Sequence, residues 1–357
     1  MNPYILAIDT SCDDTSVAIM NGDCVLSSVV SSQNDIHTEW GGVVPALAKR
    51  AHQEYIDSCV CLAMKKAKIK EFSQLNAIAV TYGPGLAPSL EVGVAKAKQL
   101  ALENNLPLIP VNHMEGHILS SLLKNSNGNY YSSVDTIELP WLILVVSGGH
   151  TEIVWCKEIG TYQVLGHTLD DAAGEAFDKI ARMLDLGYPG GSVIAELSKK
   201  GNPEQYKLPR PMMQSNSNDF SFSGLKTACL YNTNDLKQEL GEEFAKIIPD
   251  YCASVQEAIV DSLLIKFKRV LKKYKPKTAL VGGGVSANLR LREKMRAVMK
   301  TKNIPVYFPF KKFCMDNAAM IGLAAYYKYT RNEFFTQKED IESVDRVPNL
   351  TYEPWKK

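Results

Sequence analysis

Two histidines stand four residues apart in the segment His113-Met114-Glu115-Gly116-His117. On a helix this spacing brings both imidazoles to one face, where they can bind a single metal ion. Asp316, in Cys314-Met315-Asp316-Asn317, is the candidate for a third, carboxylate ligand. The alternative is that the two histidines only pack or cap, without any metal. The sequence therefore predicts a metal site and leaves a purely structural role open.

The same segment is similar to the H-E-x-x-H motif of zinc proteases, in which the glutamate acts as the general base. Here Glu115 stands two residues from each histidine, so on a helix it points away from the imidazoles. A glutamate in that position cannot act as the base, and a protease is disfavoured.

Turns of glycine and small hydroxyl residues form a second kind of candidate site. Ser147-Gly148-Gly149 separates two apolar runs, and Gly282-Gly283-Gly284 follows another and precedes Asn288. Such turns bring backbone N–H groups close to anionic oxygens, and a helix start favours an anion as well. One glycine turn alone is weak evidence, but several in one chain point to a phosphate-containing ligand.

An acidic cluster begins a helix expected from about Ala172 to Leu184. Asp170 or Asp171 can cap that helix. Asp178 is two turns further in, where capping its own helix is impossible, and its carboxylate could accept two hydrogen bonds from a ribose diol. The loop Tyr188-Pro189-Gly190-Gly191 then allows backbone to approach a ligand.

The elements that must position these residues repeat along the chain. An apolar run, a small polar turn and a second apolar run occur at 4–20, and the same pattern begins again at Trp141, 137 residues after Tyr4. This predicts two β-hairpins in duplicated domains. Between and after them, expected helices and strands alternate, with helices at about 45–68 and 244–274. The sequence therefore predicts an α/β fold with helices flanking the sheets.

Composition and charge narrow the class of protein. The chain has 357 residues, of which 45% are hydrophobic, and this is enough for about two domains. No apolar run reaches the roughly 18 residues of a membrane span, and the start is unlike a signal peptide, so we expect a cytoplasmic protein. Eight cysteines without any C-x-x-C pair indicate reduced thiols.

Charge is distributed unevenly along the chain. Residues 265–302 carry thirteen Lys or Arg and one acid, Glu293. We expect part of this segment to contact a polyanion, with Arg290 and Arg292 contributing; a solvated helix face is the alternative.

Nine motifs occur together and in order: DTSCDDTSVAI, GGVVPALAKRAH, HMEGH, VVSGGHTEI, DDAAGEAFDK, GYPGG, FSFSGLKTA, GGGVSANLRLR and CMDNAAMIG. In this combination the sequence resembles the universal tRNA threonylcarbamoyladenosine transferase family over about residues 4–327. The resemblance implies the actin-like, Hsp70 and sugar-kinase fold, with two similar domains around a nucleotide cleft. It also implies transfer of a threonylcarbamoyl group from threonylcarbamoyl-adenylate to the N6 amine of the adenosine 3′ of the anticodon, in tRNAs that read codons beginning with A, with release of AMP.

The resemblance also assigns residues and partners. His113, His117 and Asp316 match metal ligands, for which iron is the first choice and zinc the alternative. The matching substrate-binding positions are Val145, Val146, Ser147, Gly148, Gly149, Asp178, Gly191 and Asn288. Besides tRNA, the implied partners are an inactive homologue and a small ATPase. No general base emerges from the motifs.

With this resemblance the domains can be given bounds. We expect a first actin-like domain at 1–124, a linker at 125–137, and a second domain at 138–316 with nucleotide and metal residues. A helix at 317–336 should return to the first domain, and 337–357 should form an extended tail. Pro88, Glu91 and Ser192 differ from the residues usual in bacterial members.

Two other functions compete with this interpretation. An ATP-dependent small-molecule kinase of the same fold would explain the glycine turns but not the two histidines with Asp316. A non-catalytic scaffold like the family's inactive homologue would lack the metal pair, which this chain retains.

Overall fold

The computed structural model describes residues 2–38, 42–130 and 137–352. The chain forms two compact units: unit 1 comprises Met1–Thr136, Glu158–Tyr162 and Pro309–Lys357, and unit 2 comprises Ile137–Lys157 and Gln163–Phe308. Of the expected linker 125–137, residues 131–136 lie outside the described residues, as do 353–357 of the expected tail. Each unit contains one five-stranded sheet.

Unit 1 is built on a mixed sheet in which β1 is the central strand. The strand order is β3 (Cys24–Ser32), β2 (Asp14–Asn21), β1 (Tyr4–Asp9), β4 (Ala77–Gly83), β5 (Leu108–Asn112). β1, β2 and β3 run antiparallel, whereas β1, β4 and β5 run parallel. Helices cover both faces of β1, which explains why it is an almost continuous apolar run rather than an alternating one.

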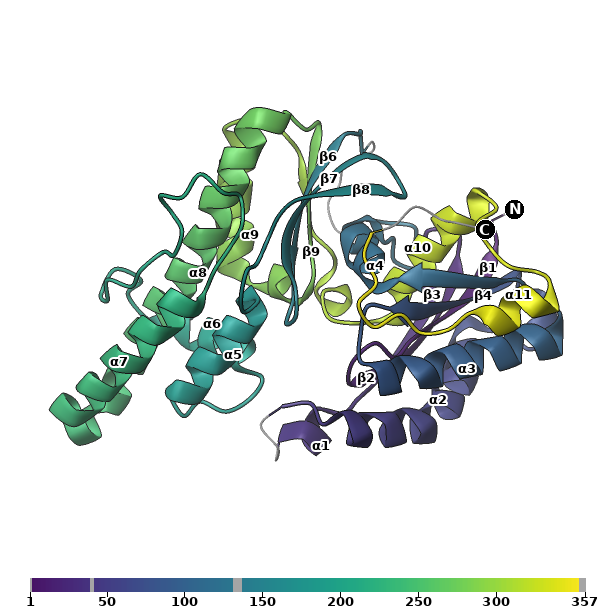
Figure 1. Ribbon diagram of the computed structural model, residues 1–357, viewed down its shortest axis with the longest axis horizontal. Coiled ribbons are helices and arrows are strands. Elements are labelled where there is room, and N and C mark those ends of the chain that lie inside the picture. The colour runs from purple at the N-terminus through teal and green to yellow at the C-terminus, as the bar shows by residue number, and fades with distance from the viewer. Residues whose placement is uncertain (1, 39–41, 131–136, 353–357) are drawn as a thin grey trace. The chain divides into compact units, whose positions relative to one another are not determined.

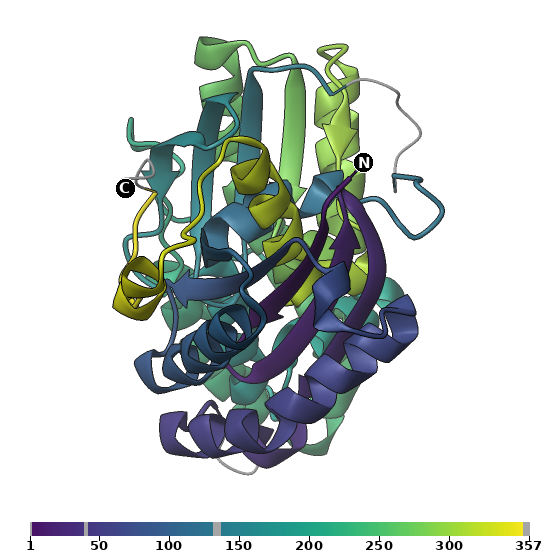
Figure 2. The same cartoon turned by 90° about the vertical axis from the view of Figure 1, so that its right-hand side faces the viewer.

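The helices of unit 1 divide between the two faces of this sheet. Leu6 and Ile8 pack with residues of α2 (Pro45–Ala67) and α3 (Ala87–Asn104). On the other face, α10 (Ala318–Thr330) approaches so closely that a Cβ on Gly322 would lie 3.3 Å from the Cβ of Ala7. Figures 1 and 2 show α10, near the end of the colour scale, beside the purple N-terminal strands. The short helices are α1 (Asn34–Thr38), α4 (His113–Leu119) and α11 (Lys338–Ser343).

Unit 2 repeats the sheet of unit 1. Its order is β10 (Val306–Tyr307), β9 (Thr278–Gly282), β6 (Trp141–Val146), β7 (Thr151–Glu158), β8 (Thr161–His167). β6 pairs antiparallel with β7 and parallel with β9, as β1 does with β2 and β4. If β6 to β10 are matched in order to β1 to β5, the two sheets have the same strand order. This confirms the duplication predicted from the hairpin repeat.

Five helices pack with the sheet to form the core of unit 2. They are α5 (Ala173–Met183), α6 (Gly190–Leu197), α7 (Ser223–Leu240), α8 (Phe244–Tyr274) and α9 (Leu289–Lys300). α8 buries apolar residues at helical spacing over most of its length, and Phe267 packs in one cluster with Phe177 of α5 and Leu225 of α7. Among the described residues, no helix is long and apolar enough to cross a membrane.

The C-terminal part of the chain departs from the expected bounds. The whole of Pro309–Lys357 groups with unit 1, whereas the sequence suggested a return to the first domain at 317. The backbone N–H of Ala318 donates to Ser16 Oγ at 2.8 Å, which ties this segment to β2. The described part of the expected extended tail contains the helix α11 and is packed, because Ile341 in α11 and Val344 after it are buried in the core of unit 1.

Candidate functional site

The helix that carries both histidines begins at the carboxyl end of a strand. α4 follows β5 directly, and the side chain of Asn112 caps it by accepting a hydrogen bond from the N–H of Met114 at 2.8 Å. All seven residues of α4 are buried. The expected one-turn spacing is therefore realised, with His113 and His117 on one face of a fixed helix.

Asp316 meets both imidazoles, within unit 1. Its Oδ1 lies 3.1 Å from Nε2 of His117 and 3.5 Å from Nε2 of His113. Asn317, the next residue, caps α10 by accepting from the N–H of Met320 at 3.1 Å, and this cap fixes where Asp316 lies. Ligand atoms of the two histidines and the aspartate all lie within 4.8 Å of one another. The structure thus brings the predicted metal ligands together.

The chemistry of this group fits a cation. Nδ1 of both histidines is buried and has no hydrogen bond of good geometry with any residue that the structure describes. Burial lowers the pKa of His113, but the carboxylates of Asp316 and Asp9 outweigh this effect and raise it to about 10. Burial would raise the pKa of Asp316, yet the two histidines hold it well below its usual range. The site therefore favours positive charge, and two imidazole nitrogens with one carboxylate suit iron or zinc.

Asp9 is a functional candidate that the sequence analysis missed. It is the last residue of β1, it is 1% exposed, and its Oδ1 lies 3.5 Å from Nδ1 of His113 and accepts from the N–H of Ser11 at 3.2 Å. A carboxylate behind a ligating imidazole orients the ring and raises its basicity. The sequence does show an acidic residue at the end of an apolar strand. β1 and β5 both run parallel to β4, so their carboxyl ends lie at the same edge of the sheet, and this brings Asp9 close to His113.

Glu115 points away from this group, as expected from its spacing. The residue is 6% exposed, and its carboxylate accepts a hydrogen bond from Tyr162 Oη at 3.1 Å. It therefore does not occupy the position of a protease base.

In unit 2, the end of β6 and the turn that follows it carry five of the predicted substrate-binding residues. Val145 and Val146 end β6. The turn is closed by the N–H of Ser147, which donates to the His150 carbonyl at 2.8 Å, and by the N–H of His150, which donates to Ser147 Oγ at 3.1 Å. Gly148 and Gly149 are exposed, and within the described part of the chain their N–H groups have no acceptor. Both are open to an anionic oxygen.

The first turn of α5 packs directly against this glycine turn. The N–H of Gly174 donates to the Ser147 carbonyl at 3.1 Å, and a Cβ on Gly174 would lie 2.9 Å from Gly148 Cα. The N–H of Ala173 donates to Thr151 Oγ1 at 2.8 Å. The start of α5 is therefore satisfied by the turn and by β7.

The expected capping of α5 by an aspartate is accordingly wrong. Asp170 instead accepts from the N–H of Phe222 at 2.7 Å, just before α7. Asp171 forms ion pairs with Lys179, at 2.9 Å, and with Lys226.

Asp178 uses one oxygen to hold the start of α6. Its Oδ1 accepts from the N–H groups of Gly190, at 2.8 Å, and Gly191, at 3.2 Å. Burial raises the pKa of Asp178, although these two amides act in the opposite direction. At Gly191 an added Cβ would meet only the Cβ of Phe177, at 3.7 Å, so the backbone is open there. Asp178 and Gly191 are thus neighbours, as the motifs suggested.

Asn288 is held from two sides by the protein. Its side chain caps α9 by accepting from the N–H of Leu291 at 3.1 Å, and its Nδ2 donates to Gln256 Oε1 at 2.7 Å. The predicted substrate residues thus all lie in unit 2, around the turns that follow β6 and β9 and the start of α5 and α6, whereas the predicted metal ligands lie in unit 1.

Gly283, in the turn after β9, packs closely against the end of β6. Its φ is +86°, and an added Cβ would lie 2.4 Å from the Val146 carbonyl oxygen. We expect Gly283→Ala to lower the free energy of unfolding by roughly 2–4 kcal/mol through backbone strain and overpacking. Gly149→Ala is the matched control, because its Cβ would meet nothing within 4 Å. Equal denaturant midpoints for the two variants would contradict this.

Two arginines expected to face a polyanion are engaged with the protein. Arg290 donates to both oxygens of Glu257, at 2.8 and 3.0 Å, and pairs with Glu293. Arg292 is 3% exposed and donates to the Ser286 carbonyl at 2.6 Å. Arg290 is thus paired with an acid of α8 and with one of its own helix, and contact of the two arginines with a polyanion stays a prediction.

The three departures from the usual bacterial pattern fit their surroundings. Pro88 lies in the first turn of α3, where a backbone N–H is not needed. Glu91 pairs with Lys49 of α2 at 3.1 Å, and Ser192 Oγ donates to the Pro189 carbonyl at 2.9 Å.

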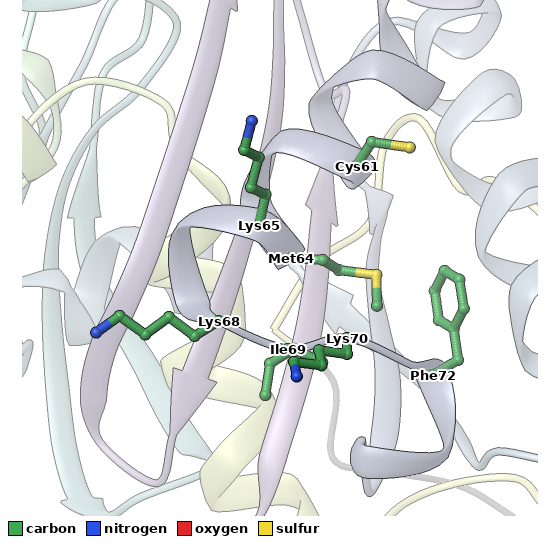
Figure 3. Close-up of a pocket in the computed structure, with 7 residues that line it drawn as sticks. All are labelled: Cys61, Met64, Lys65, Lys68, Ile69, Lys70 and Phe72. Carbon is green, nitrogen blue, oxygen red and sulfur yellow. The ribbon is translucent and has the colours of Figure 1, made fainter.

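A surface pocket on unit 1 lies apart from the predicted metal ligands. Its lining, drawn in Figure 3, comes from the end of α2 and the segment after it: Cys61, Met64, Lys65, Lys68, Ile69, Lys70 and Phe72. The three lysine side chains point in different directions, so they do not converge on one small anion.

Comparison with known proteins identifies close relatives of the whole chain. The family model described as tRNA N6-adenosine threonylcarbamoyltransferase matches residues 24–323. Proteins of that name are 44% identical over 352 residues in Lactococcus lactis subsp. cremoris (strain SK11), covering 98% of this chain and 97% of the relative. One from Thermosipho africanus (strain TCF52B) is 45% identical over 350 residues, covering 97% and 99%.

Comparison with solved structures supports the fold. A crystal structure of full-length HypF in its phosphate- and nucleotide-bound form aligns with a TM-score of 0.56 at 13% identity. HypF of T. kodakarensis aligns with a TM-score of 0.55 at 14% identity. These alignments cover 92% and 93% of this chain, which spans about half the length of the two structures, 46% and 48%.

Proposed function

The chain belongs to the tRNA N6-adenosine threonylcarbamoyltransferase family, and so it transfers a threonylcarbamoyl group to adenosine in tRNA. We propose that its donor is threonylcarbamoyl-adenylate. The acceptor is the N6 amine of the adenosine 3′ of the anticodon in tRNAs that read codons beginning with A. The amine forms a bond to the carbamoyl carbon, and the bond from that carbon to the adenylate phosphate oxygen breaks. AMP leaves with the electron pair, and the surplus proton of the amine goes to water.

The residues at the edge of unit 2 are assigned to the adenylate. The N–H groups of Gly148 and Gly149 are open donors for its phosphate oxygens. Asp178 Oδ1 already holds two amides, so Oδ2 is assigned to the ribose diol, beside the open backbone of Gly191. Asn288 supports the site through its cap on α9, with Val145, Val146 and Ser147 forming the strand end and turn.

The residues of unit 1 are assigned to a divalent cation. His113, His117 and Asp316 would hold it, and Asp9 would orient His113. A bound cation supplies Lewis-acid chemistry, which polarises a carbonyl or positions an oxygen of the threonyl group. We propose iron first and zinc as the alternative. The rest of the rate enhancement comes from holding amine and donor together, since the mixed anhydride is already activated.

The observation that carries this proposal is the convergence of two imidazoles and one carboxylate in a chain of this family. A small-molecule kinase of the same fold needs no such group. The discriminating experiment supplies either threonylcarbamoyl-adenylate with tRNA, or ATP alone. The proposal expects modified tRNA and AMP from the first, and phosphate transfer or release from ATP alone would favour the kinase.

We also place the reaction in the cytoplasm, with an inactive homologue and a small ATPase as partner proteins.

Exposed lysines at the amino edge of the unit 2 sheet are assigned to the tRNA backbone. Lys272 and Lys275 precede β9, and Lys300 and Lys302 precede β10, its parallel neighbour. Changing all four to Gln should lower the slope of log affinity against log salt by about 3, since each phosphate contact contributes roughly 0.7–0.9. Filter binding of tRNA at several salt concentrations measures this slope.

The lysines of the Figure 3 pocket provide the matched control. Lys65, Lys68 and Lys70 are also exposed and occupy the corresponding edge of unit 1, before β4. Changing these three to Gln should leave the slope unchanged. The reverse result, with a loss of slope in this variant alone, would move the tRNA contact to unit 1.

A further inference from the structure

A buried polar cluster lies behind the helix that carries the two histidines. Glu115 is 6% exposed and accepts a hydrogen bond from Tyr162 Oη at 3.1 Å. Lys328 of α10, 8% exposed, and Arg331 just after α10 place positive charge around the same carboxylate. A buried carboxylate without such partners would be costly, so these contacts fix where Glu115 lies.

The residue that donates to Glu115 belongs to a rigid turn. Residues 158–162, which comprise the end of β7, the turn after it and the start of β8, group with unit 1. Arg331 donates to the Ile159 carbonyl at 3.2 Å and is itself held by both oxygens of Glu333, at 2.6 and 3.0 Å. Gly160 has a φ of +96°, and a Cβ there would lie 2.8 Å from an Arg331 nitrogen. Contacts with Arg331 therefore hold the turn in place, and the backbone that carries Tyr162 has a fixed position.

Geometry links Glu115 to both metal ligands. Each residue of a helix is rotated by about 100° from the last, so Glu115 lies about 200° from His113 and from His117. Any rotation of α4 about its axis moves the carboxylate and both imidazoles together. α4 is only seven residues long and lies beside α10 (Figure 1). A Cβ on Gly116 of α4 would lie 2.9 Å from Ile321 Cδ1 of α10, so the two helices are in close contact. The contact of Glu115 lies on the face of α4 opposite to the histidines, so it acts together with the packing of Gly116 to hold the rotation of this short helix.

We propose that Tyr162 and Glu115 are positioning residues for the metal ligands. The hydrogen bond from Tyr162 to Glu115 sets the rotation of α4, and with it the directions in which His113 and His117 present Nε2 toward Asp316. This inference rests on the proposed metal site and adds two residues that touch neither metal nor substrate. Partners hydrogen-bonded directly to metal ligands typically change metal affinity by 10- to 100-fold, and we expect a contact that acts through the helix to fall at the lower end of this range.

Zinc binding to the purified, metal-free full chain tests the inference. Tyr162→Phe removes a single oxygen and should raise the Zn²⁺ dissociation constant about ten-fold. It should lower the thermal midpoint of the metal-free protein by only a few degrees, because the buried carboxylate loses one hydrogen bond. The absorption bands of bound Co²⁺ should shift as the ligand directions change. Tyr231→Phe is the matched control, on a tyrosine of α7 that is 64% exposed.

A double-mutant cycle separates positioning from general packing. Glu115→Gln keeps an acceptor for Tyr162 and should bind Zn²⁺ nearly as the original chain does, whereas Glu115→Ala should lose as much affinity as Tyr162→Phe. The double variant Tyr162→Phe, Glu115→Ala should be no worse than either single one, because both remove the same contact. Unchanged Zn²⁺ affinity and Co²⁺ bands in Tyr162→Phe would overturn the inference, and so would fully additive losses. Absence of Zn²⁺ binding in the original chain would instead overturn the metal site itself.

Discussion

His117→Ala should lose its bound metal and reduce threonylcarbamoyl transfer by about 100- to 1,000-fold, the range for several kcal/mol of lost transition-state stabilisation. His117 supplies one of only two imidazoles, and its Nε2 lies 3.1 Å from Asp316. The loss of stability should be moderate, because the variant removes the contact of Nε2 with Asp316 and the packing of the side chain, while Nδ1 has no hydrogen-bond partner among the described residues. A thermal midpoint within a few degrees of the original is therefore expected. Elemental analysis and a transfer assay on the same sample measure both effects.

A histidine elsewhere provides the control for this variant. His167→Ala removes an imidazole whose side chain is 57% exposed, in β8, and should retain metal and activity. Chelation of the original protein should reproduce the loss seen in His117→Ala, and adding metal back should reverse it. Full transfer by a verified metal-free sample would exclude the metal from the reaction.

Asp178→Asn should weaken binding of an unreactive adenylate analogue by roughly 1.5–3 kcal/mol, the range for a hydrogen bond to a charged group. The asparagine keeps an Oδ1 that can accept from Gly190 and Gly191, so the start of α6 should remain in place. It replaces Oδ2 by an amide that cannot accept from a ribose hydroxyl. Calorimetry measures the affinity, and a denaturation curve should show a loss of stability below about 1 kcal/mol.

The pH dependence of this binding provides a second measurement on the same carboxylate. Burial raises the pKa of Asp178, so its protonation on acidification begins at a higher pH than for an exposed aspartate. Adenylate affinity should therefore fall as pH decreases toward that raised pKa, and Asp178→Asn should not show this fall. Asp185→Asn, on a side chain that is 79% exposed, serves as the control. Original affinity in folded Asp178→Asn would remove Asp178 from the ribose.

Local sequence signals predicted most of the sheet and the long helices. The apolar run at Tyr4–Asp9 and the helix at Phe244–Tyr274 were expected nearly to the residue, because continuous apolar or helical periodicity defines them. β3, Cys24–Ser32, was missed because four of its nine residues are serines and only alternate positions are buried. The packed tail was missed as well, since burial of Ile341 depends on a core whose other members lie far away in the sequence.

In the candidate site, too, residues with a local sequence pattern were predicted, whereas residues whose contacts depend on the fold were not. His113 and His117 are recognisable from spacing, and Asp316 from its motif. Asp9 could not be assigned, because its contact with His113 depends on β1 and β5 ending at one edge. Asp170 looked like a cap for α5, but its partner Phe222 is 52 residues away. A single sequence does not show which polar groups pair when they lie far apart along the chain, and both of these contacts are of that kind.

Nucleoside analysis of tRNA from cells depleted of this protein tests the central claim most directly. Threonylcarbamoyladenosine should disappear from tRNAs that read codons beginning with A, because the chain transfers that group to their adenosine. Supplying the original chain should restore the nucleoside, and supplying His117→Ala at an equal protein level should not. If the nucleoside persists at its normal level after depletion, or returns fully with His117→Ala, the account is contradicted.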